Sequence, residues 1–329
     1  MSARHACSPL EALLVDSAFD ADVYPDEPMR RHTMYRIGGP ARFYVQVGSI
    51  GALKRLVGAC QECRVPWVAV GRGSNLLVSD EGFPGVVIAL GRDFRACRFD
   101  EQTCSFIVGA GVPLSAGAPL TGAEASGAGE AAPPPSVVQE AFRRSLSGLE
   151  FAVGTPGTVG GAVRMNAGTR EQGIADRVVS VTTLSPQAGL VRREAADIRW
   201  GYRSSSFSPD EVIVECELAV KPADPYLLRG KMEAAHTRRK KTQPLTLPSC
   251  GSVFKNPEGY SAGQLIEQAG LKGARVGGAQ ISEVHANFIV NRDNATAQDV
   301  LELINMARSK VYEAYGIELQ PEVRFLGFA

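Results

Sequence analysis

The segment from residue 154 to residue 168, GTPGTVGGAVRMNAG, limits most strongly what this chain can fold into. Its glycines lie among small residues, so the main chain stays open to close approach by another group. A flat or extended ligand lying against the backbone would explain this pattern. A close-packed turn in the core would also explain it, but the length and glycine density favour a ligand site.

The composition describes an ordinary globular protein without a charge bias. Of 329 residues, 44% are hydrophobic and 21% are charged, which suits two or three domains. Lys and Arg total 35 and Asp and Glu total 35, so the net charge predicts neither nucleic acid nor a membrane surface as partner. We expect a cytoplasmic protein, because neither a signal peptide nor an apolar run of about 20 residues occurs.

The seven cysteines are scattered along the chain. Cys60 and Cys63 form a CxxC, but no second pair follows at the spacing of a zinc site. We therefore expect reduced, mostly buried thiols and no bound metal.

The N-terminal part of the chain predicts a small α/β unit after an irregular lead-in over residues 1–30. Residues 34–47 indicate two strands around a Gly38-Gly39-Pro40 turn. Ser49 is a suitable cap for an amphipathic helix. The apolar residues of that helix recur at Leu53, Leu56, Val57 and Cys60.

Further strands are predicted over residues 67–70 and 85–90, and later over 178–184 and 212–220. The stretch 115–147 between these pairs is rich in Ala, Gly, Pro and Ser. We expect it to be a flexible insertion without chemistry.

The C-terminal third reads as a separate α+β domain. Residues 225–241 predict a helix and residues 288–290 predict a strand. Residues 261–270 predict a short helix that begins at a serine and stops at a glycine, and residues 296–316 predict a longer one with a capping box.

Four further motifs carry candidate chemistry. The loop VGRGSNLL at residues 70–77 could hold a phosphate on its N–H groups, although a tight surface turn explains it equally well. Arg203, within WGYRSSSF, could clamp a carboxylate through its planar guanidinium. Ser252, within SCGSVFKNP, lacks a nucleophile elbow but could donate a proton in a dry site. Glu322 stands at the start of a terminal strand. Taken singly, a surface arginine, a capping serine and an ion pair with Arg324 are the simpler explanations.

Together these motifs resemble the UDP-N-acetylenolpyruvoylglucosamine reductase family, in order and over about residues 33–324. The matching segments are TMYRIGGPA, GRGSNLLV, VGTPGTVGGAVRMNAG, YRSSSF, SCGSVFKNP, AGQLIEQAGLKG, GAQISEVHANFIVN and PEV. No single motif decides the matter, whereas the ordered set is highly specific.

The resemblance implies an α+β fold with three domains. After the lead-in 1–30, residues 31–95 and 96–225 would form a FAD-binding unit of the vanillyl-alcohol-oxidase-like (PCMH) type. Residues 226–329 would form the α+β domain that holds the sugar nucleotide.

The resemblance also implies the cofactors and the reaction. NADPH would reduce the FAD, which would then reduce the enolpyruvyl group of UDP-N-acetylglucosamine enolpyruvate to give UDP-N-acetylmuramate. This product is a peptidoglycan precursor, so the enzyme would serve cell-wall synthesis, cell shape and cell division. The FAD would be noncovalent, because neither Gly71–Leu76 nor Gly154–Gly168 holds a His or Cys. The implied cofactor-binding residues are Gly71, Arg72, Gly73, Ser74, Asn75, Leu76, Gly154, Thr155, Pro156, Gly160, Gly161, Asn166, Ala167 and Gly168.

Three residues match the family's catalytic positions. Arg203 and Glu322 match the residues that stabilise the enol and carboxylate, and Ser252 matches the proton donor. Substrate contacts are implied, less directly, for Tyr202, Lys255 and Asn256. The expected partner is the UDP-sugar enolpyruvate, and we expect a monomer.

Two features depart from the wider family. Cys250 stands where we expect a small residue such as Ala, and its thiol could make the site sensitive to oxidation. Only 49 positions separate Arg203 from Ser252, which leaves no room for the loop that carries a substrate-clamping Tyr in one subgroup. The resemblance is therefore to the loop-lacking type II subgroup.

Two competing hypotheses remain at this point. Another oxidoreductase of the same flavin fold, acting on a small hydroxy acid or alcohol, would share both glycine-rich motifs but would not need SCGSVFKNP or Glu322. A non-catalytic flavin- or nucleotide-binding protein would have no reason to bring Arg203, Ser252 and Glu322 together.

Overall fold

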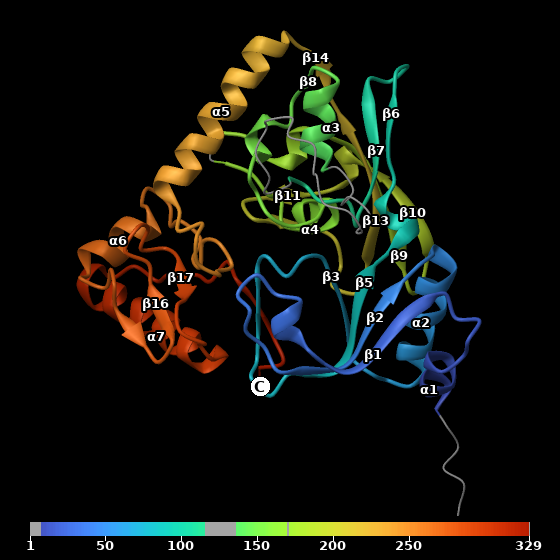
Figure 1. Ribbon diagram of the computed structural model, residues 1–329, viewed down its shortest axis with the longest axis horizontal. Coiled ribbons are helices and arrows are strands. Elements are labelled where there is room, and N and C mark those ends of the chain that lie inside the picture. Colours follow the sequence, from blue (N-terminus) through green and yellow to red (C-terminus); the bar gives the residue numbers. More distant parts are fainter. Residues whose placement is uncertain (1–7, 116–135, 170, 329) are drawn as a thin grey trace, which may run out of the picture. The chain divides into compact units, whose positions relative to one another are not determined.

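The computed structural model describes residues 8–115, 136–169 and 171–328 (Figure 1). The chain divides into two compact units, each assembled from several stretches of sequence. The first unit comprises Met1–Tyr24, Tyr44–Gly71 and Gly85–His236, and the second comprises Pro25–Phe43, Arg72–Pro84 and Thr237–Ala329. No helix within the described ranges is long and apolar enough to cross a membrane.

These units do not follow the domain boundaries expected from the sequence. The sequence suggests a division near residue 95, whereas residues on both sides of it lie in the first unit. Two stretches of the expected first subdomain, 31–43 and 72–84, instead group with the C-terminal residues, as does the end of the expected lead-in. The reason is a long-range pairing, because β4 (Leu76–Val78) lies parallel to β18 (Arg324–Leu326) near the end of the chain.

The first unit contains the greater part of a four-stranded sheet in the order β1-β2-β5-β3, in which β3 and β5 are parallel. The helix α2 (Ile50–Glu62) begins at Ser49, whose hydroxyl accepts a hydrogen bond from the Ala52 N–H at 3.3 Å. As predicted, Leu53, Leu56, Val57 and Cys60 are buried on one side of α2. The strands are β1 (Ala21–Pro28), β2 (Pro40–Val47), β3 (Trp67–Val70) and β5 (Phe83–Leu90), which confirms three of the predicted strands.

The irregular lead-in predicted for residues 1–30 is wrong over the described part, which forms α1 (Pro9–Leu14) and β1. Ser8 and Glu11 form a capping box at the start of α1. Leu10 and Leu13 are buried, so α1 gains apolar packing that short polar segments rarely have.

The first of the two strands predicted within residues 34–47 is also wrong. The Thr33 hydroxyl donates to the Ile37 carbonyl at 2.8 Å and accepts from the Ile37 N–H at 3.3 Å, which closes a turn over these residues. Arg36 has a φ of 56°, a left-handed conformation that a strand excludes. The hydrogen bonds of the Thr33 hydroxyl therefore favour a turn over the predicted strand.

The second sheet of the first unit has five antiparallel strands in the order β10-β9-β13-β7-β6. The strands predicted over 178–184 and 212–220 are confirmed as β9 (Val178–Ser185) and β13 (Val212–Ala219). The helix α4 (Val159–Arg164) packs on β13 and β7. The remaining strands are β6 (Cys97–Asp100), β7 (Ser105–Gly109) and β10 (Gly189–Glu194).

The predicted insertion 115–147 lies partly outside the described residues. Its C-terminal part is not flexible, as the sequence suggests, but forms α3 (Val137–Arg143) and β8 (Leu146–Ser147), and β8 pairs with β14 (Lys221–Pro222). A capping box of Ser136 and Gln139 begins α3. Val137, Val138 and Ala141 then enter the core, which gives this helix a reason to form.

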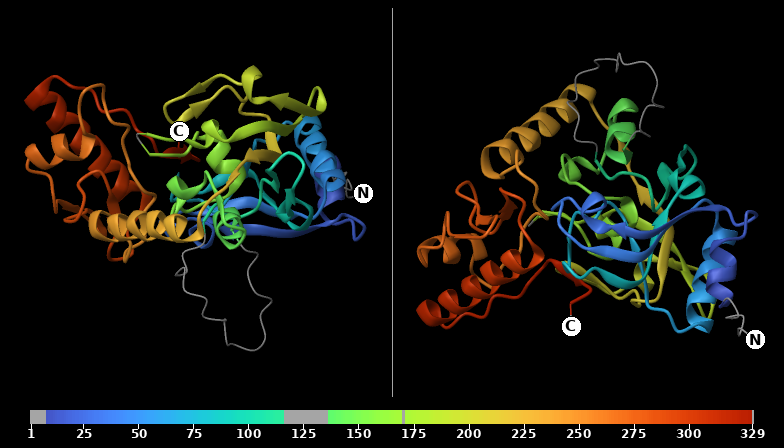
Figure 2. Two further views of the ribbon diagram at one scale, coloured as in Figure 1. Left: turned by 90° about the horizontal axis from the view of Figure 1, so that it is seen from above. Right: turned by 60° about the horizontal axis from the view of Figure 1, so that its bottom comes forward.

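The second unit is an α+β structure around its own core, and its C-terminal stretch is drawn in orange to red in Figure 2. A three-stranded antiparallel sheet, β15-β16-β17, packs against α7. The predicted caps of α7 are confirmed, since Thr296 and Asp299 form a capping box and Gly316 ends the helix in the left-handed conformation. The bounds are α5 (Pro225–Thr242), which joins the two units, α6 (Ala262–Gln268), α7 (Ala297–Tyr315), β15 (Arg275–Val276), β16 (Ala279–Ile281) and β17 (Ile289–Asn291).

Candidate active site

The glycine-rich segment 154–168 surrounds the short helix α4. Thr158 caps this helix by accepting the Gly161 N–H at 3.4 Å. A Cβ placed on Gly160 would lie 2.8 Å from the Ala110 Cβ, so no side chain fits there. Gly161 is exposed, and a Cβ on it would meet only the Thr158 hydroxyl at 3.6 Å. This segment therefore presents bare main chain, which fits a flat ring system lying against it.

The loop that ends β3 meets the start of α4. A Cβ placed on Gly71 would lie 2.5 Å from the Thr158 Oγ1, and Gly71 itself is exposed. On the other side of the segment, the Gly154 N–H is held by the Ser115 Oγ at 2.9 Å. The structure thus brings Gly71 and the segment 154–168, two predicted cofactor-binding elements, into contact within the first unit.

The rest of the predicted phosphate loop, Arg72–Leu76, belongs to the second unit. Gly73 has a φ of 58°, and a Cβ on it would lie 2.3 Å from the His32 carbonyl oxygen. The Met34 N–H donates to the Gly73 carbonyl at 3.2 Å. Only glycine fits this close approach to the TMYRIGGPA segment.

Arg203 lies on the turn of a small hairpin formed by β11 (Trp200–Gly201) and β12 (Ser204–Ser205). Its Nη2 donates to the Gly168 carbonyl at 2.7 Å and its Nη1 to the Asn166 carbonyl at 3.5 Å. The guanidinium carbon lies 5.1 Å from the centre of the Tyr202 ring, and that side chain is exposed. The predicted catalytic arginine is therefore anchored on the end of the glycine-rich segment.

Asn166 connects the same two elements through its side chain. Its Nδ2 donates to the Gly201 carbonyl at 3.0 Å, and its Oδ1 accepts from the Ala175 N–H at 3.2 Å. The sequence predicts Asn166 as a cofactor ligand, but both ends of its amide group bond to protein. The side chain of Asn166 positions the Arg203 hairpin.

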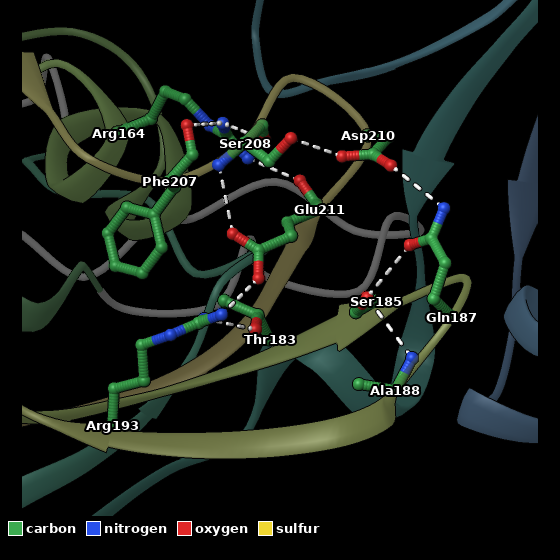
Figure 3. Close-up of polar contacts among 10 residues, drawn as sticks. All are labelled: Arg164, Thr183, Ser185, Gln187, Ala188, Arg193, Phe207, Ser208, Asp210 and Glu211. Carbon is green, nitrogen blue, oxygen red and sulfur yellow. Dashed lines mark hydrogen bonds and ion pairs between the residues drawn. The ribbon is translucent and has the colours of Figure 1, made fainter.

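Sequence reasoning missed Arg164, although it lies within the glycine-rich motif. Its Nη1 donates to the carbonyls of Ser208 at 2.8 Å and Phe207 at 3.3 Å, and its Nη2 donates to the Glu211 carbonyl (Figure 3). Its own carbonyl accepts the Ser205 hydroxyl at 2.7 Å. The signal available in the sequence was a single arginine among residues that otherwise have small or apolar side chains.

A buried carboxylate secures the loop that Arg164 holds. The Glu211 side chain is only 7% exposed, and it accepts from the Ser208 N–H at 2.9 Å and pairs with Arg193 (Figure 3). Arg193 also donates to the Thr183 hydroxyl at 2.9 Å. This network ties the loop after Phe207 to β9 and β10, and so fixes the far end of the Arg203 hairpin.

In the second unit, the Ser252 segment is held by a buried asparagine. The Asn287 Oδ1 accepts the Phe254 N–H at 2.9 Å, and its Nδ2 donates to the Phe254 carbonyl at 2.8 Å. The Asn287 carbonyl accepts the Val253 N–H at 2.8 Å. Sequence reasoning missed this residue too, because nothing in the local pattern shows that Asn287 reaches a segment 33 positions away.

Glu322 lies beside the Ser252 segment. The Glu322 N–H donates to the Val253 carbonyl at 2.7 Å, and the Lys255 N–H donates to the Gln320 carbonyl at 2.9 Å. The structure therefore brings the backbones of Ser252 and Glu322, two predicted catalytic residues, next to each other.

Asn256 has a structural task in addition to its expected substrate contact. Its Oδ1 accepts the Ala262 N–H at 3.0 Å and so caps α6. Ser261, which the sequence predicts as the cap, occupies the N-cap position but makes no side-chain hydrogen bond to the helix. The helix is predicted correctly, but its capping side chain is not.

The Cys250 thiol is buried in the core of the second unit at 3% exposure. Burial raises its pKa to about 12, and the nearby Glu322 adds to the effect while a contact with Tyr35 opposes it. Since the thiolate is the reactive form, this thiol resists oxidation. The structure therefore opposes the expectation that Cys250 makes the site sensitive to oxidants.

Two family models match the chain. Residues 41–121 match the FAD binding domain, and residues 243–326 match the C-terminal domain of UDP-N-acetylenolpyruvoylglucosamine reductase. The reductase 2 of this name from Symbiobacterium thermophilum is 43% identical over 302 residues, which are 92% of this chain and 91% of the relative. The reductase from Geobacter sulfurreducens is 39% identical over 318 residues, 96% and 98% of the two chains. The crystal structure of the reductase from Thermus caldophilus matches with a TM-score of 0.74 at 36% identity, and it covers 93% and 98% of the two chains.

The bare glycine-rich backbone and the matched FAD binding domain define an FAD-dependent oxidoreductase, and the predicted α+β fold class is confirmed. The C-terminal match and the relatives define it further. The chain belongs to the UDP-N-acetylenolpyruvoylglucosamine reductase family.

Proposed function

We propose that Arg203, Ser252 and Glu322 together carry out the reaction of this family in this chain. That reaction is the NADPH-dependent, FAD-mediated reduction of UDP-N-acetylglucosamine enolpyruvate to UDP-N-acetylmuramate in peptidoglycan precursor synthesis. The observation that carries the proposal is the hydrogen bond from the Glu322 N–H to the Val253 carbonyl at 2.7 Å, directly beside Ser252. It supports a shared task for two residues that lie far apart in sequence.

The residues present fit an FAD molecule. Gly71 and Gly161 are exposed and carry no side chain over their main chain, and Gly160 packs closely against Ala110. Bound FAD, reduced by NADPH, supplies the hydride for the substrate. We propose that it is held without a covalent bond, since neither glycine-rich motif offers a His or Cys side chain.

Ser252 is the proposed proton donor to the carbon next to the substrate carboxylate. A serine hydroxyl is a weak acid, so it can protonate only a strongly basic carbon and only where water is excluded. The two hydrogen bonds from Asn287 to Phe254 fix the backbone two residues beyond Ser252. We propose that this support limits the movement of the Ser252 backbone, since proton transfer requires a fixed geometry.

Arg203 and Glu322 are the proposed stabilisers of the enol and carboxylate before the carbon is protonated. Arg203 offers a planar group with five N–H donors, of which the Gly168 and Asn166 carbonyls take two. Donors fixed before the reaction stabilise a developing charge without reorganisation. Tyr202, Lys255 and Asn256 are proposed to contact the sugar nucleotide.

We also propose that the protein works as a monomer in the cytoplasm, where nucleotide sugars are made. Size-exclusion chromatography with light scattering would measure the first point. A mass of two chains would contradict it.

The test of the reaction is a visible spectrum recorded in three steps without air. The flavin band should be present in the purified protein, bleach on addition of NADPH, and return on addition of the enolpyruvyl sugar nucleotide. A band that bleaches but does not return would show that the enolpyruvyl sugar nucleotide is not the substrate. A protein that holds no flavin even after incubation with FAD would overturn the proposal.

A further inference from the structure

Asn75 forms hydrogen bonds with the residues at the start of β18 (Arg324–Leu326) and just before it, where Glu322 lies. Its side-chain Nδ2 donates to the Glu322 carbonyl at 3.0 Å, and its main-chain carbonyl accepts the Arg324 N–H at 3.0 Å. The two bonds reach the residues on either side of Val323. They extend the parallel pairing of β4 with β18 by one step towards the catalytic residue.

The other side of the Glu322 peptide is bonded to the Ser252 segment. The Glu322 N–H donates to the Val253 carbonyl, so its N–H and its carbonyl face two different partners. One partner, Asn75, comes from the predicted phosphate loop, and the other, Val253, follows the proposed proton donor Ser252. The Glu322 main chain therefore lies between Asn75 and Val253, within one unit.

We propose that Asn75 is a positioning residue for Glu322, and that its side chain does not serve chiefly as a cofactor ligand. The sequence assigns Asn75 to FAD because it lies in the GRGSNLLV loop. The structure uses its amide group to fix the peptide of Glu322. This inference rests on the catalytic role proposed for Glu322.

The physical reason is that a carboxylate side chain moves with its own peptide. Val323, 4% exposed, anchors this segment in the core independently of Asn75. Without the amide donor, the half-buried Glu322 carbonyl loses this bond, and the longer bond from the Val323 N–H to the Val253 carbonyl at 3.4 Å holds the peptide less firmly. A displacement of about 1 Å in a catalytic group can cost about 100-fold in rate.

The experiment compares the two half-reactions in Asn75→Ala and Asn75→Asp holoenzymes. Asp is close to Asn in size and accepts hydrogen bonds, but it cannot donate to the Glu322 carbonyl. We expect both variants to retain FAD and to be reduced by NADPH within about twofold of the parent rate. Reoxidation by the enolpyruvyl sugar nucleotide should slow by about 10- to 100-fold.

Asn291→Ala is the matched control. Asn291 belongs to the same unit and donates from its amide group to the Tyr35 carbonyl at 2.9 Å, and its Oδ1 accepts the Ala295 N–H at 2.9 Å. Its loss therefore removes a bond of the same kind and one more. A general loss of stability would affect this variant and the Asn75 variants alike. We expect Asn291→Ala to lower the Tm without separating the two half-reactions.

Loss of FAD from the Asn75 variants, or an equal decline of both half-reactions, would overturn the proposal and assign Asn75 to the cofactor. A parallel Glu322→Gln variant separates this result from failure of the catalytic assignment. If the Glu322→Gln enzyme is reoxidised at the parent rate, the catalytic role proposed for Glu322 is wrong. If Glu322→Gln is slow and the Asn75 variants are not, only the positioning role fails.

The double variant Asn75→Ala, Glu322→Gln provides the last readout. If Asn75 acts through Glu322, adding Asn75→Ala to Glu322→Gln should slow reoxidation no further. Slowing by the full factor of the single variant would show that Asn75 acts independently of Glu322, and would overturn the inference.

Discussion

The two proposed halves of the catalytic machinery are held in opposite ways. Arg203 is anchored by its own side chain, whose guanidinium bonds to the carbonyls of Gly168 and Asn166. Ser252 and Glu322 are positioned through the main chain, by way of Val253, Phe254 and Asn75. The proposed catalytic side chain of Arg203 therefore also stabilises the local fold. Around Ser252 and Glu322, other residues stabilise the local fold.

This difference predicts how tolerant each position is. A change at Ser252 should remove chemistry and leave stability intact. A change at Arg203 should affect both the reaction and the stability. Two main-chain carbonyls would lose their hydrogen-bond donor, and the substrate would lose the same donor group.

The largest expected effect is that of Ser252→Ala. Reoxidation by the enolpyruvyl sugar nucleotide should slow by about 10²- to 10⁴-fold, the usual contribution of a positioned proton donor. The Tm and the reduction by NADPH should not change. Ser261→Ala is the control, since this serine makes no capping hydrogen bond. A Ser252→Ala enzyme that reoxidises normally would remove Ser252 from the reaction.

The second effect is that of Arg203→Lys, measured by reoxidation rate and by denaturant unfolding. Lysine keeps the charge but lacks the planar fork that serves two carbonyls and the substrate together. We expect slower reoxidation and a loss of about 1–3 kcal/mol in the free energy of unfolding, from the carbonyls left without donors. Unchanged stability would show that the bonds from Arg203 to the Gly168 and Asn166 carbonyls do not stabilise the fold. Arg203 would then not differ from Ser252 in this respect.

A smaller effect is expected for Arg164→Met. It removes the donor of three loop carbonyls while keeping the length of the side chain. Reoxidation should slow by about tenfold, because the far end of the Arg203 hairpin loosens. Arg199→Met, at an exposed arginine nearby, should have no such effect. Equal results in the two variants would deny Arg164 a positioning role.

The smallest expected effect is a change of stability with pH, caused by His285, which contacts the Asn287 that holds the Ser252 segment. Burial lowers the pKa of His285 from 6.5, and its Nδ1 accepts the Asn287 N–H at 3.1 Å, which requires the neutral ring. Below about pH 6.5 the unfolded chain binds a proton that the folded chain resists, so stability should fall as the pH decreases. His285→Asn keeps an acceptor without titrating, and should flatten this part of a Tm-against-pH curve. A curve identical to that of the parent would exclude His285 as the cause.

The sequence predicts well what is local. The helix caps at Ser49, Thr296 and Gly316 follow from side chains within a few positions of the helix ends, and all three are confirmed. The apolar face of α2 follows from its period. Motif order was enough to propose Arg203, Ser252 and Glu322, because the family resemblance runs over most of the chain.

The sequence predicts poorly what depends on distant partners. Asn75 and Glu322 are 247 positions apart, and no periodicity shows that one donates to the other. The strand predicted after Thr33 does not form, because the Thr33 hydroxyl closes a turn by bonding to Ile37. The family resemblance implies ligand contacts for Asn166 and Asn256, but it does not show that their side chains also bond to protein groups.

The parallel pairing of β4 with β18 has a consequence for synthesis on the ribosome. Residues 324–326 are made long after Leu76–Val78, yet they complete the pairing of the strand that begins at Leu76. Most of the first unit is translated long before this, and domains generally begin to fold as they emerge. The loop before β4 remains without this pairing until residues 324–326 have left the exit tunnel. A chain cut before Arg324 would therefore have most of its first unit and lack β18.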